Sequence, residues 1–169
     1  MGGLHRVLEP TGPTEKRENM SLIEKFVEQR GVFEEAYEKG GWDNLRPYFT
    51  PDVSYEVMNM SFHCQLNGID ELIFGLKWST DRFDKLCTRT VGLNSFVAEE
   101  NNTVLVHADI RFSRGDAPVF ETGLWEIATY RDGMIERMID VYDAGEAARF
   151  DDWMTKWGVG LDPRYLPAK

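Results

Sequence analysis

The sequence is poor in cysteine, in positive charge and in long apolar runs. Its 169 residues include two cysteines, Cys64 and Cys87, which form neither a zinc-site spacing nor a disulfide framework. Its 19 lysines and arginines against 29 aspartates and glutamates give a net charge of −10, which argues against nucleic-acid binding. No apolar run reaches the roughly 18 residues of a membrane span, and residues 1–19 contain no apolar signal core. These absences favour a cytoplasmic protein with no membrane partner and two reduced thiols.

The motifs of common cofactor sites are missing as well. The sequence contains no CxxC, HExxH, P-loop or GxGxxG motif, so we expect no metal centre and no organic cofactor. In contrast, 42% of the residues are hydrophobic, and ten Phe, six Tyr and five Trp are present. That content and length predict one domain with a substantial core.

Apolar periodicity divides the chain into a leader, a domain and a C-terminal segment. Residues 1–19 have no apolar period and are expected to form a disordered leader. An α+β domain is expected over residues 20–145, and residues 146–169 are expected to form a helix and a tail that pack on it. At the start of the domain, Ser21 and Glu24 have the spacing of a capping box that begins a helix.

The expected elements place helices first and a strand meander afterwards, an order typical of α+β proteins. Pro51-Asp52 is expected to be a turn, and Asp132-Gly133 is the strongest hairpin signal. Helices are predicted over residues 21–40, 42–49, 69–86 and 145–157, long strands over 53–60, 87–98, 103–113, 119–130 and 134–142, and a short strand or irregular return over 61–66.

Alternation along the strand over residues 103–113 separates an apolar face from a mixed face. In an ordinary surface sheet the mixed face lies in water. Alternatively, the apolar face is a buried subunit interface and the mixed face lines a pocket, and this second arrangement predicts a homodimer. The apolar face consists of Val104, Val106, Ala108, Ile110 and Phe112, and the mixed face of Leu105, His107, Asp109 and Arg111.

Several stretches carry a resemblance to a known superfamily. They are Tyr48–Tyr55, Asn67–Leu72, His107–Asp109, Gly123–Ile127 with Asp132–Ile135, and Asp140–Asp143. Between about residues 21 and 150, the sequence resembles the nuclear transport factor 2-like superfamily, nearest its limonene epoxide hydrolase and SnoaL-like polyketide cyclase branches. The resemblance implies a cone-shaped fold in which a curved, mostly antiparallel sheet and N-terminal helices enclose a pocket. This fold hosts hydrolases, isomerases, cyclases, dehydratases and non-enzymes, so it does not specify a reaction.

The resemblance to the epoxide hydrolase branch also implies catalytic residues. Asp109 and Asp140 match its two inward aspartates, as acid and base respectively, and Tyr55 matches a tyrosine that helps to hold water. The sequence departs at His107, where the branch has an arginine, because imidazole cannot fork between two carboxylates. It departs again at Val57, where the branch has an asparagine and the ketosteroid isomerase branch has its catalytic aspartate.

Paired carboxylates suit acid–base chemistry for a physical reason. Two carboxylates in an apolar pocket do not both ionise easily, so one can act as an acid and the other as a base. We therefore expect Asp109 and Asp140 to approach within a few ångströms, with His107 on the same wall to tune the pair or to carry the proton. The alternative is a set of solvated strand aspartates and a structural histidine.

A further group of residues is predicted to bind the substrate. Arg111 and Glu121 are expected to pair across neighbouring strands, and Arg111 could supply the cation that is missing at His107. The aromatic members could equally belong to the core. The predicted substrate-binding residues are Tyr37, Tyr48, Asn59, His63, Trp78, Arg111, Glu121, Trp125, Met138 and Tyr142.

Together these features predict a cofactor-independent acid–base enzyme with an internal pocket. Its substrate would be a small, largely apolar molecule of aromatic, terpenoid or polyketide type, and its reaction an epoxide hydrolysis or a cyclase, isomerase or dehydratase step. The alternative is a non-catalytic binding or dimeric association module of the same fold. An open pocket lined by the acid–base groups would favour the enzyme, and a pocket filled by side chains would favour the module.

Overall fold

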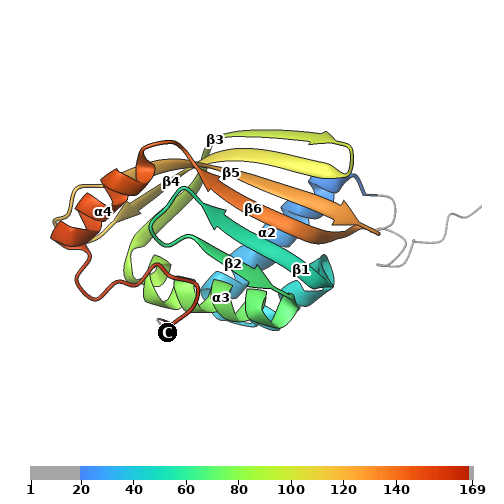
Figure 1. Ribbon diagram of the computed structural model, residues 1–169, viewed down its shortest axis with the longest axis horizontal. Coiled ribbons are helices and arrows are strands. Elements are labelled where there is room, and N and C mark those ends of the chain that lie inside the picture. Colours follow the sequence, from blue (N-terminus) through green and yellow to red (C-terminus); the bar gives the residue numbers. More distant parts are fainter. Residues whose placement is uncertain (1–19, 168–169) are drawn as a thin grey trace, which may run out of the picture.

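The computed structural model describes residues 20–167, so the expected leader over residues 1–19 lies outside the described part of the chain. A curved, mixed six-stranded sheet forms its centre (Figure 1). β1 and β6 are parallel neighbours, and all other neighbouring strands are antiparallel. The strands are β1 (Phe49–Met58), β2 (Cys64–Asn67), β3 (Thr88–Glu100), β4 (Thr103–Ser113), β5 (Phe120–Arg131) and β6 (Met134–Tyr142), in the spatial order β2-β1-β6-β5-β4-β3.

Helices cover one side and one end of this sheet (Figure 1). The predicted capping box begins α2, because the Ser21 hydroxyl accepts from the Glu24 amide at 3.2 Å and the Glu24 carboxylate accepts from the Ser21 amide at 2.7 Å. The predicted order of elements and the α+β class are confirmed. The helices are α2 (Leu22–Lys39), the 3-10 helix η1 (Trp42–Tyr48), α3 (Ile69–Arg82), the 3-10 helix η2 (Asp84–Leu86) and α4 (Glu146–Trp157). None of the helices in residues 20–167 is long and apolar enough to cross a membrane.

The first strand begins earlier than its sequence suggests. β1 includes Pro51 and Asp52, which we expected to form a turn. Proline is tolerated here because the pairing of β1 with β6 is irregular between Phe49 and Ser54, so Pro51 does not have to donate to a regular ladder.

The apolar face of β4 packs into the core, contrary to the expected outer interface. Val104 is fully buried, and Val106 and Phe112 belong to the same core cluster. The mixed face with His107 and Asp109 therefore lies on the outer side of the sheet. The prediction was wrong because the side-chain period of a strand is two residues, so choosing the other face moves every side chain at once.

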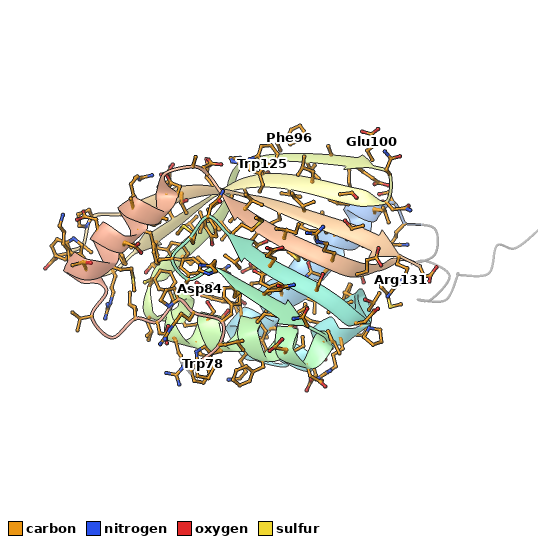
Figure 2. The ribbon with its side chains drawn as sticks, viewed as in Figure 1. Trp78, Asp84, Phe96, Glu100, Trp125 and Arg131 are labelled. Carbon is orange, nitrogen blue, oxygen red and sulfur yellow. The ribbon has the colours of Figure 1, made fainter. Side chains whose placement is uncertain are left out.

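On β5, too, the residues expected to face the pocket lie on the outer side of the sheet. On β6, the residues expected to face inward do so. The buried residues of β5 alternate from Phe120 to Tyr130 and include Glu126. Glu121 and Trp125 consequently lie on the outer side, where Trp125 makes an edge-to-face contact with Phe96, with ring centroids 6.2 Å apart (Figure 2). In β6, Met138 and Asp140 are buried on the inner side, as expected.

The segment after α4 folds back along α3. The Ser79 hydroxyl donates to the carbonyl oxygen of Pro163 at 3.1 Å, and the Asp162 amide donates to that of Arg82 at 3.0 Å. A Cβ atom at Gly75 would lie 3.3 Å from the carbonyl oxygen of Tyr165, so the absent side chain permits this close approach. The tail thereby brings Tyr165 into contact with the inner side of the sheet.

Candidate active site

A cavity of about 520 Å³ lies between α2 and the inner face of the sheet. Its volume falls within the range of small-molecule sites, roughly 300–1,000 Å³. Its walls combine an apolar majority with a few ionisable groups. The apolar walls include Phe26, Leu72, Val106, Ile110, Leu124 and Met138, and the polar groups include Arg30, Glu34, Tyr55, Glu126, Asp140 and Tyr142.

Asp140 is the buried carboxyl group of this cavity, with 8% of the residue exposed. The Tyr55 hydroxyl donates to its Oδ2 at 2.5 Å. Its Oδ1 is buried and has no hydrogen-bond partner among the described residues. Leaving a buried polar atom unpaired costs about 1–3 kcal/mol. The free oxygen therefore marks a place where a ligand or a water molecule would bind.

Two tyrosines fix the orientation of Asp140 through its Oδ2 atom. The hydroxyl oxygens of Tyr55 and Tyr165 lie 3.1 Å apart, and their ring centroids 5.4 Å apart. Each hydroxyl carries one proton, so Tyr165 donates to Tyr55 when Tyr55 donates to Asp140. Burial raises the pKa of both phenols, which keeps both of them protonated as donors at neutral pH.

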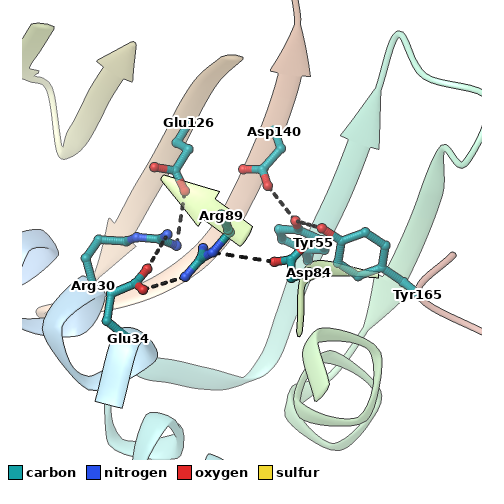
Figure 3. Close-up of polar contacts among 8 residues, drawn as sticks. All are labelled: Arg30, Glu34, Tyr55, Asp84, Arg89, Glu126, Asp140 and Tyr165. Atoms are coloured by element: carbon teal, nitrogen blue, oxygen red, sulfur yellow. Dashed lines mark hydrogen bonds and ion pairs between the residues drawn. The ribbon is translucent and has the colours of Figure 1, made fainter. Parts of the chain in front are cut away.

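The carboxylate that lies beside Asp140 in the cavity is Glu126 rather than Asp109. Glu126 on β5 is the direct register partner of Asp140 on β6, and both side chains line the cavity (Figure 3). Arg30 of α2 pairs with Glu126, with 3.2 Å between Nη1 and Oε1. A cation next to two carboxylates is therefore present, but it comes from a helix and not from the sheet.

The surroundings of Asp140 change its acidity. Burial, and secondly the negative charge of Glu126, raise the pKa of Asp140 to about 7, against the opposing effects of Tyr55 and Arg30. A carboxyl group with such a pKa populates both protonation states near neutral pH. General acids and bases work best under this condition.

The expected approach of Asp109 to Asp140 is wrong, because the two residues lie on opposite faces of the sheet. His107 lies on the outer face as well, where its ring centroid is 4.7 Å from that of Trp125 and its Nε2 is 3.7 Å from Asp143. Asp109 is the register partner of Gly123 on that face.

The outer face also holds the predicted pair of Arg111 and Glu121. The two side chains do pair, with 2.5 Å between Nε and Oε2, but outside the cavity. They therefore cannot supply its cation.

Of the other predicted binding residues, Met138 and Tyr142 line the cavity. Trp78 lies outside it on α3 (Figure 2). The Arg82 guanidinium lies over the Trp78 ring, 3.7 Å from its centroid. The Asn59 amide donates to the carbonyl oxygen of Tyr142 at 3.0 Å. The remaining residues of the predicted binding set that do not line the cavity are Tyr37, Tyr48, His63 and Trp125.

Sequence reasoning missed Arg30, Glu126 and Tyr165, although two of them leave a signal. Arg30 lies four residues after Phe26, on the side of α2 that also buries Phe33. Glu126 interrupts the alternating apolar set of β5 between Leu124 and Ala128. A charge inside an apolar period needs a partner, and such a position points to a site. Tyr165 lies in a segment without periodicity, so no comparable signal exists for it.

Metal binding has no obvious place in the described residues. They contain no group of three or more His, Cys, Asp or Glu side chains that could hold a metal ion. The ionisable groups that do meet in the cavity are the carboxylates of Asp140, Glu126 and Glu34 with the guanidinium of Arg30. This set suits proton transfer.

Comparisons with known proteins agree with this architecture. No family model matches the sequence, and no curated protein matches it either. Among solved structures, an NTF2-like protein of Burkholderia pseudomallei is similar with a TM-score of 0.61 and 14% identity, over 80% of this chain and 99% of that one. An LEH-like epoxide hydrolase of Mycobacterium tuberculosis has a TM-score of 0.55 and 15% identity, over 80% and 92% of the two chains.

A SnoaL-like polyketide cyclase of Jannaschia is similar to the same extent, with a TM-score of 0.55 and 18% identity, over 80% and 91% of the chains. A de novo designed protein with a curved β-sheet has a TM-score of 0.54 and 18% identity, over 81% and 99%. The chain therefore has the nuclear transport factor 2-like fold, as the sequence predicted. At this level of identity the similarity concerns the fold alone, since the same backbone holds different reactions.

Proposed function

We propose that the protein is a cofactor-independent acid–base enzyme that acts on a small molecule in the cavity between α2 and the sheet. One observation carries this proposal. Asp140 lines the cavity with one carboxylate oxygen held by Tyr55 and the other without a partner in the described residues. A fixed carboxyl group with one available oxygen is placed to exchange a proton with a bound substrate.

The lining of the cavity supports a largely apolar, uncharged substrate. Phe26, Leu124 and Met138 supply apolar surface. The cation Arg30 is compensated by Glu126 and Glu34, so it does not offer a free positive charge to an anionic molecule. A small ring or chain with one or two oxygen atoms fits this combination.

Epoxide hydrolysis is the first candidate reaction within this class. In that reaction the oxygen of water forms a bond to an epoxide carbon while the carbon–oxygen bond of the ring breaks. One carboxylate takes a proton from the water, and the opened oxygen receives a proton. The pair of Asp140 and Glu126 supports this candidate, because two neighbouring carboxyl groups can hold one acid and one base.

Isomerisation or cyclisation is the second candidate. It requires a single group that removes a proton from carbon and returns it elsewhere, and Asp140 alone would serve. The non-catalytic alternative is a binding module in which the free oxygen of Asp140 accepts a hydrogen bond from a ligand.

A screen with isotopically labelled solvent tests these alternatives together. Purified protein is incubated with epoxides, enones and lactones, once in heavy-oxygen water and once in deuterium oxide, and the products are analysed by mass spectrometry. Gain of heavy oxygen identifies hydrolysis, and gain of deuterium without added oxygen identifies isomerisation. Binding of these compounds without turnover of any of them would contradict the enzyme and favour the module.

A further inference from the structure

Arg30 is one member of a chain of alternating charges that runs away from the cavity (Figure 3). Arg30 is 3.2 Å from Glu126 and 3.7 Å from Glu34. Glu34 is in turn 2.5 Å from Nη2 of Arg89, and Nε of Arg89 is 3.9 Å from Asp84. This series of ion pairs joins α2, β3, β5 and η2, and therefore connects a cavity wall to the N-terminal end of β3.

Aromatic rings limit the freedom of both arginines. The Arg89 guanidinium lies 4.2 Å from the ring centroid of Tyr37, and that of Arg30 lies 4.5 Å from the ring centroid of Phe33. Only 7% of the Arg89 side chain is exposed. A buried guanidinium requires carboxylate partners, and a ring beneath it adds further attraction. Arg89 is therefore a fixed group rather than a solvated surface charge.

The distances among these charged residues indicate that Glu34 and Glu126 compete for Arg30. Glu34 is four residues after Arg30 on the same helix, a spacing at which the two side chains would normally pair with each other. Instead, Glu34 lies closer to Arg89, at 2.5 Å, than to Arg30, at 3.7 Å. Because Arg89 holds Glu34, Arg30 remains closest to Glu126.

We propose that Arg89 and Glu34 are positioning residues, which hold Arg30 against Glu126 and beside Asp140 and thereby set how readily Asp140 releases its proton. The negative charge of Glu126 raises the pKa of its register partner Asp140, and Arg30 opposes that rise. Asp140 therefore carries a proton in part of the molecules near neutral pH. Oδ2 of Asp140 already accepts from Tyr55, and the proton therefore lies on Oδ1, which points toward the side of Glu126 (Figure 3).

The inference rests on the proposed function, because it assigns to Asp140 the role of the acid at the start of the reaction. Arg30 is the cation among the described groups that act on Asp140, so the position of Arg30 has a large influence on the Asp140 proton. The titratable and charged groups that act with Asp140 are Tyr55 of β1, Cys64 of β2, Glu126 of β5, Tyr142 of β6, Arg30 of α2 and Tyr165 of the tail.

The test is a titration of Asp140 in the full chain, which needs no substrate. Aspartate labelled with carbon-13 at the carboxyl carbon is followed by NMR, and the signal of Asp140 is assigned from its loss in Asp140→Asn. Arg89→Lys keeps the charge but loses the fork that reaches two carboxylates. Arg89→Met also removes the charge. In both variants Glu34 is released to Arg30, and the Asp140 midpoint should rise by about half a pH unit or more.

The opposite change is expected for Glu34→Gln, because Arg30 loses a competing carboxylate and the Asp140 midpoint should fall. Arg111→Lys on the outer face is the matched control, since it alters a similarly short arginine–glutamate pair and should leave Asp140 unchanged. If Arg89→Lys titrates like the wild type, Arg89 acts only as a distant charge and the positioning role is wrong.

Thermal melts establish that each variant is folded. If Arg89→Met does not fold, Arg89→Lys and Glu34→Gln decide the question by themselves. An unchanged titration in both would overturn the positioning role and leave the proposed enzyme untouched. A failed substrate screen would contradict the enzyme and leave the titration result valid.

Discussion

The Tyr55 hydroxyl on β1 donates to Oδ2 of Asp140 on the neighbouring parallel strand β6 over 2.5 Å. β1 and β6 are the parallel pair of the sheet, and they are far apart in the sequence. Their inward side chains meet in the cavity, where Tyr165 of the tail adds a second hydroxyl. This short hydrogen bond fixes one carboxylate oxygen and leaves the other to a ligand.

Removal of that hydroxyl should change the acidity of Asp140. In Tyr55→Phe the carboxylate loses a donor, so its pKa should rise further and the free energy of unfolding should fall by about 1–3 kcal/mol. Carboxyl NMR titration and urea unfolding measure the two effects. Tyr130→Phe is the control, because the buried Tyr130 hydroxyl has no partner among the described residues and its removal should cost little. Equal losses in both variants would contradict the role of Tyr55.

The stability of the protein should depend on pH through Asp140. Its pKa in the folded state is raised from 3.8 to about 7, so the folded state holds a proton that the unfolded state releases. The contribution is fully present below about pH 4 and is lost as the pH rises through 7. Asp140→Asn removes this dependence and should be more stable than the wild type near pH 8, by on the order of a few kcal/mol.

Urea unfolding at about pH 5 and pH 8 measures this difference between Asp140→Asn and the wild type. Asp84 should add a smaller dependence of the same sign, because burial raises its pKa to about 6. If Asp140→Asn destabilises the protein equally at both pH values, burial of the Asp140 charge does not make the stability depend on pH.

Replacement by alanine of two glycines in helices should change the stability of the protein in opposite directions. In Gly75→Ala the new Cβ would lie 2.6 Å from Leu66 and 3.3 Å from the tail at Tyr165, which should cost about 1–3 kcal/mol. In Gly31→Ala nothing lies within 4 Å, and the higher helix propensity of alanine should stabilise α2 by about 0.5–1 kcal/mol. Thermal melts measure both changes. A neutral Gly75→Ala would show that the tail does not need this close approach.

The outer face of the sheet is the remaining candidate for a homodimer interface. The apolar row expected there lies in the core, but Leu105, Ile127 and Ile139 are register neighbours on the outer side and are half-buried. We propose association through this row, so that Ile127→Asp should convert a dimer into a monomer. Sedimentation at micromolar concentration measures this, and a monomeric wild type would contradict the proposal.

The sequence was informative about elements and less so about the site. Strands with long alternation, such as β4 and β6, were predicted with their correct bounds, because a period of two over ten residues is a strong local signal. The inner face of β4 was assigned wrongly because alternation separates the two faces without saying which is buried. Asp140 was placed correctly because the resemblance to the epoxide hydrolase branch implies an inward aspartate at this position, whereas the alternation of its strand does not distinguish the two faces.

Local pattern marks Arg30 and Glu126 as charges inside apolar periods, but tertiary packing decides that they meet Asp140. Arg30 reaches the cavity only because α2 crosses the inner face of the sheet, and Tyr165 only because the tail returns along α3. The similarity of His107 and Asp109 to a catalytic motif was a feature of sequence spacing, whereas the cavity is built from the opposite face of the same strand.

A comparison of Asp140→Asn with Asp109→Asn tests the central claim most directly. Both variants replace a strand aspartate by its isosteric amide, one inside the cavity and the other on the outer face. The rate of turnover is measured for any compound that the wild type converts, after melts have shown that both variants are folded. Asp140→Asn should lower the rate by about a hundredfold or more, and Asp109→Asn should leave it unchanged. A variant with Asp140→Asn that turns over like the wild type would contradict the account.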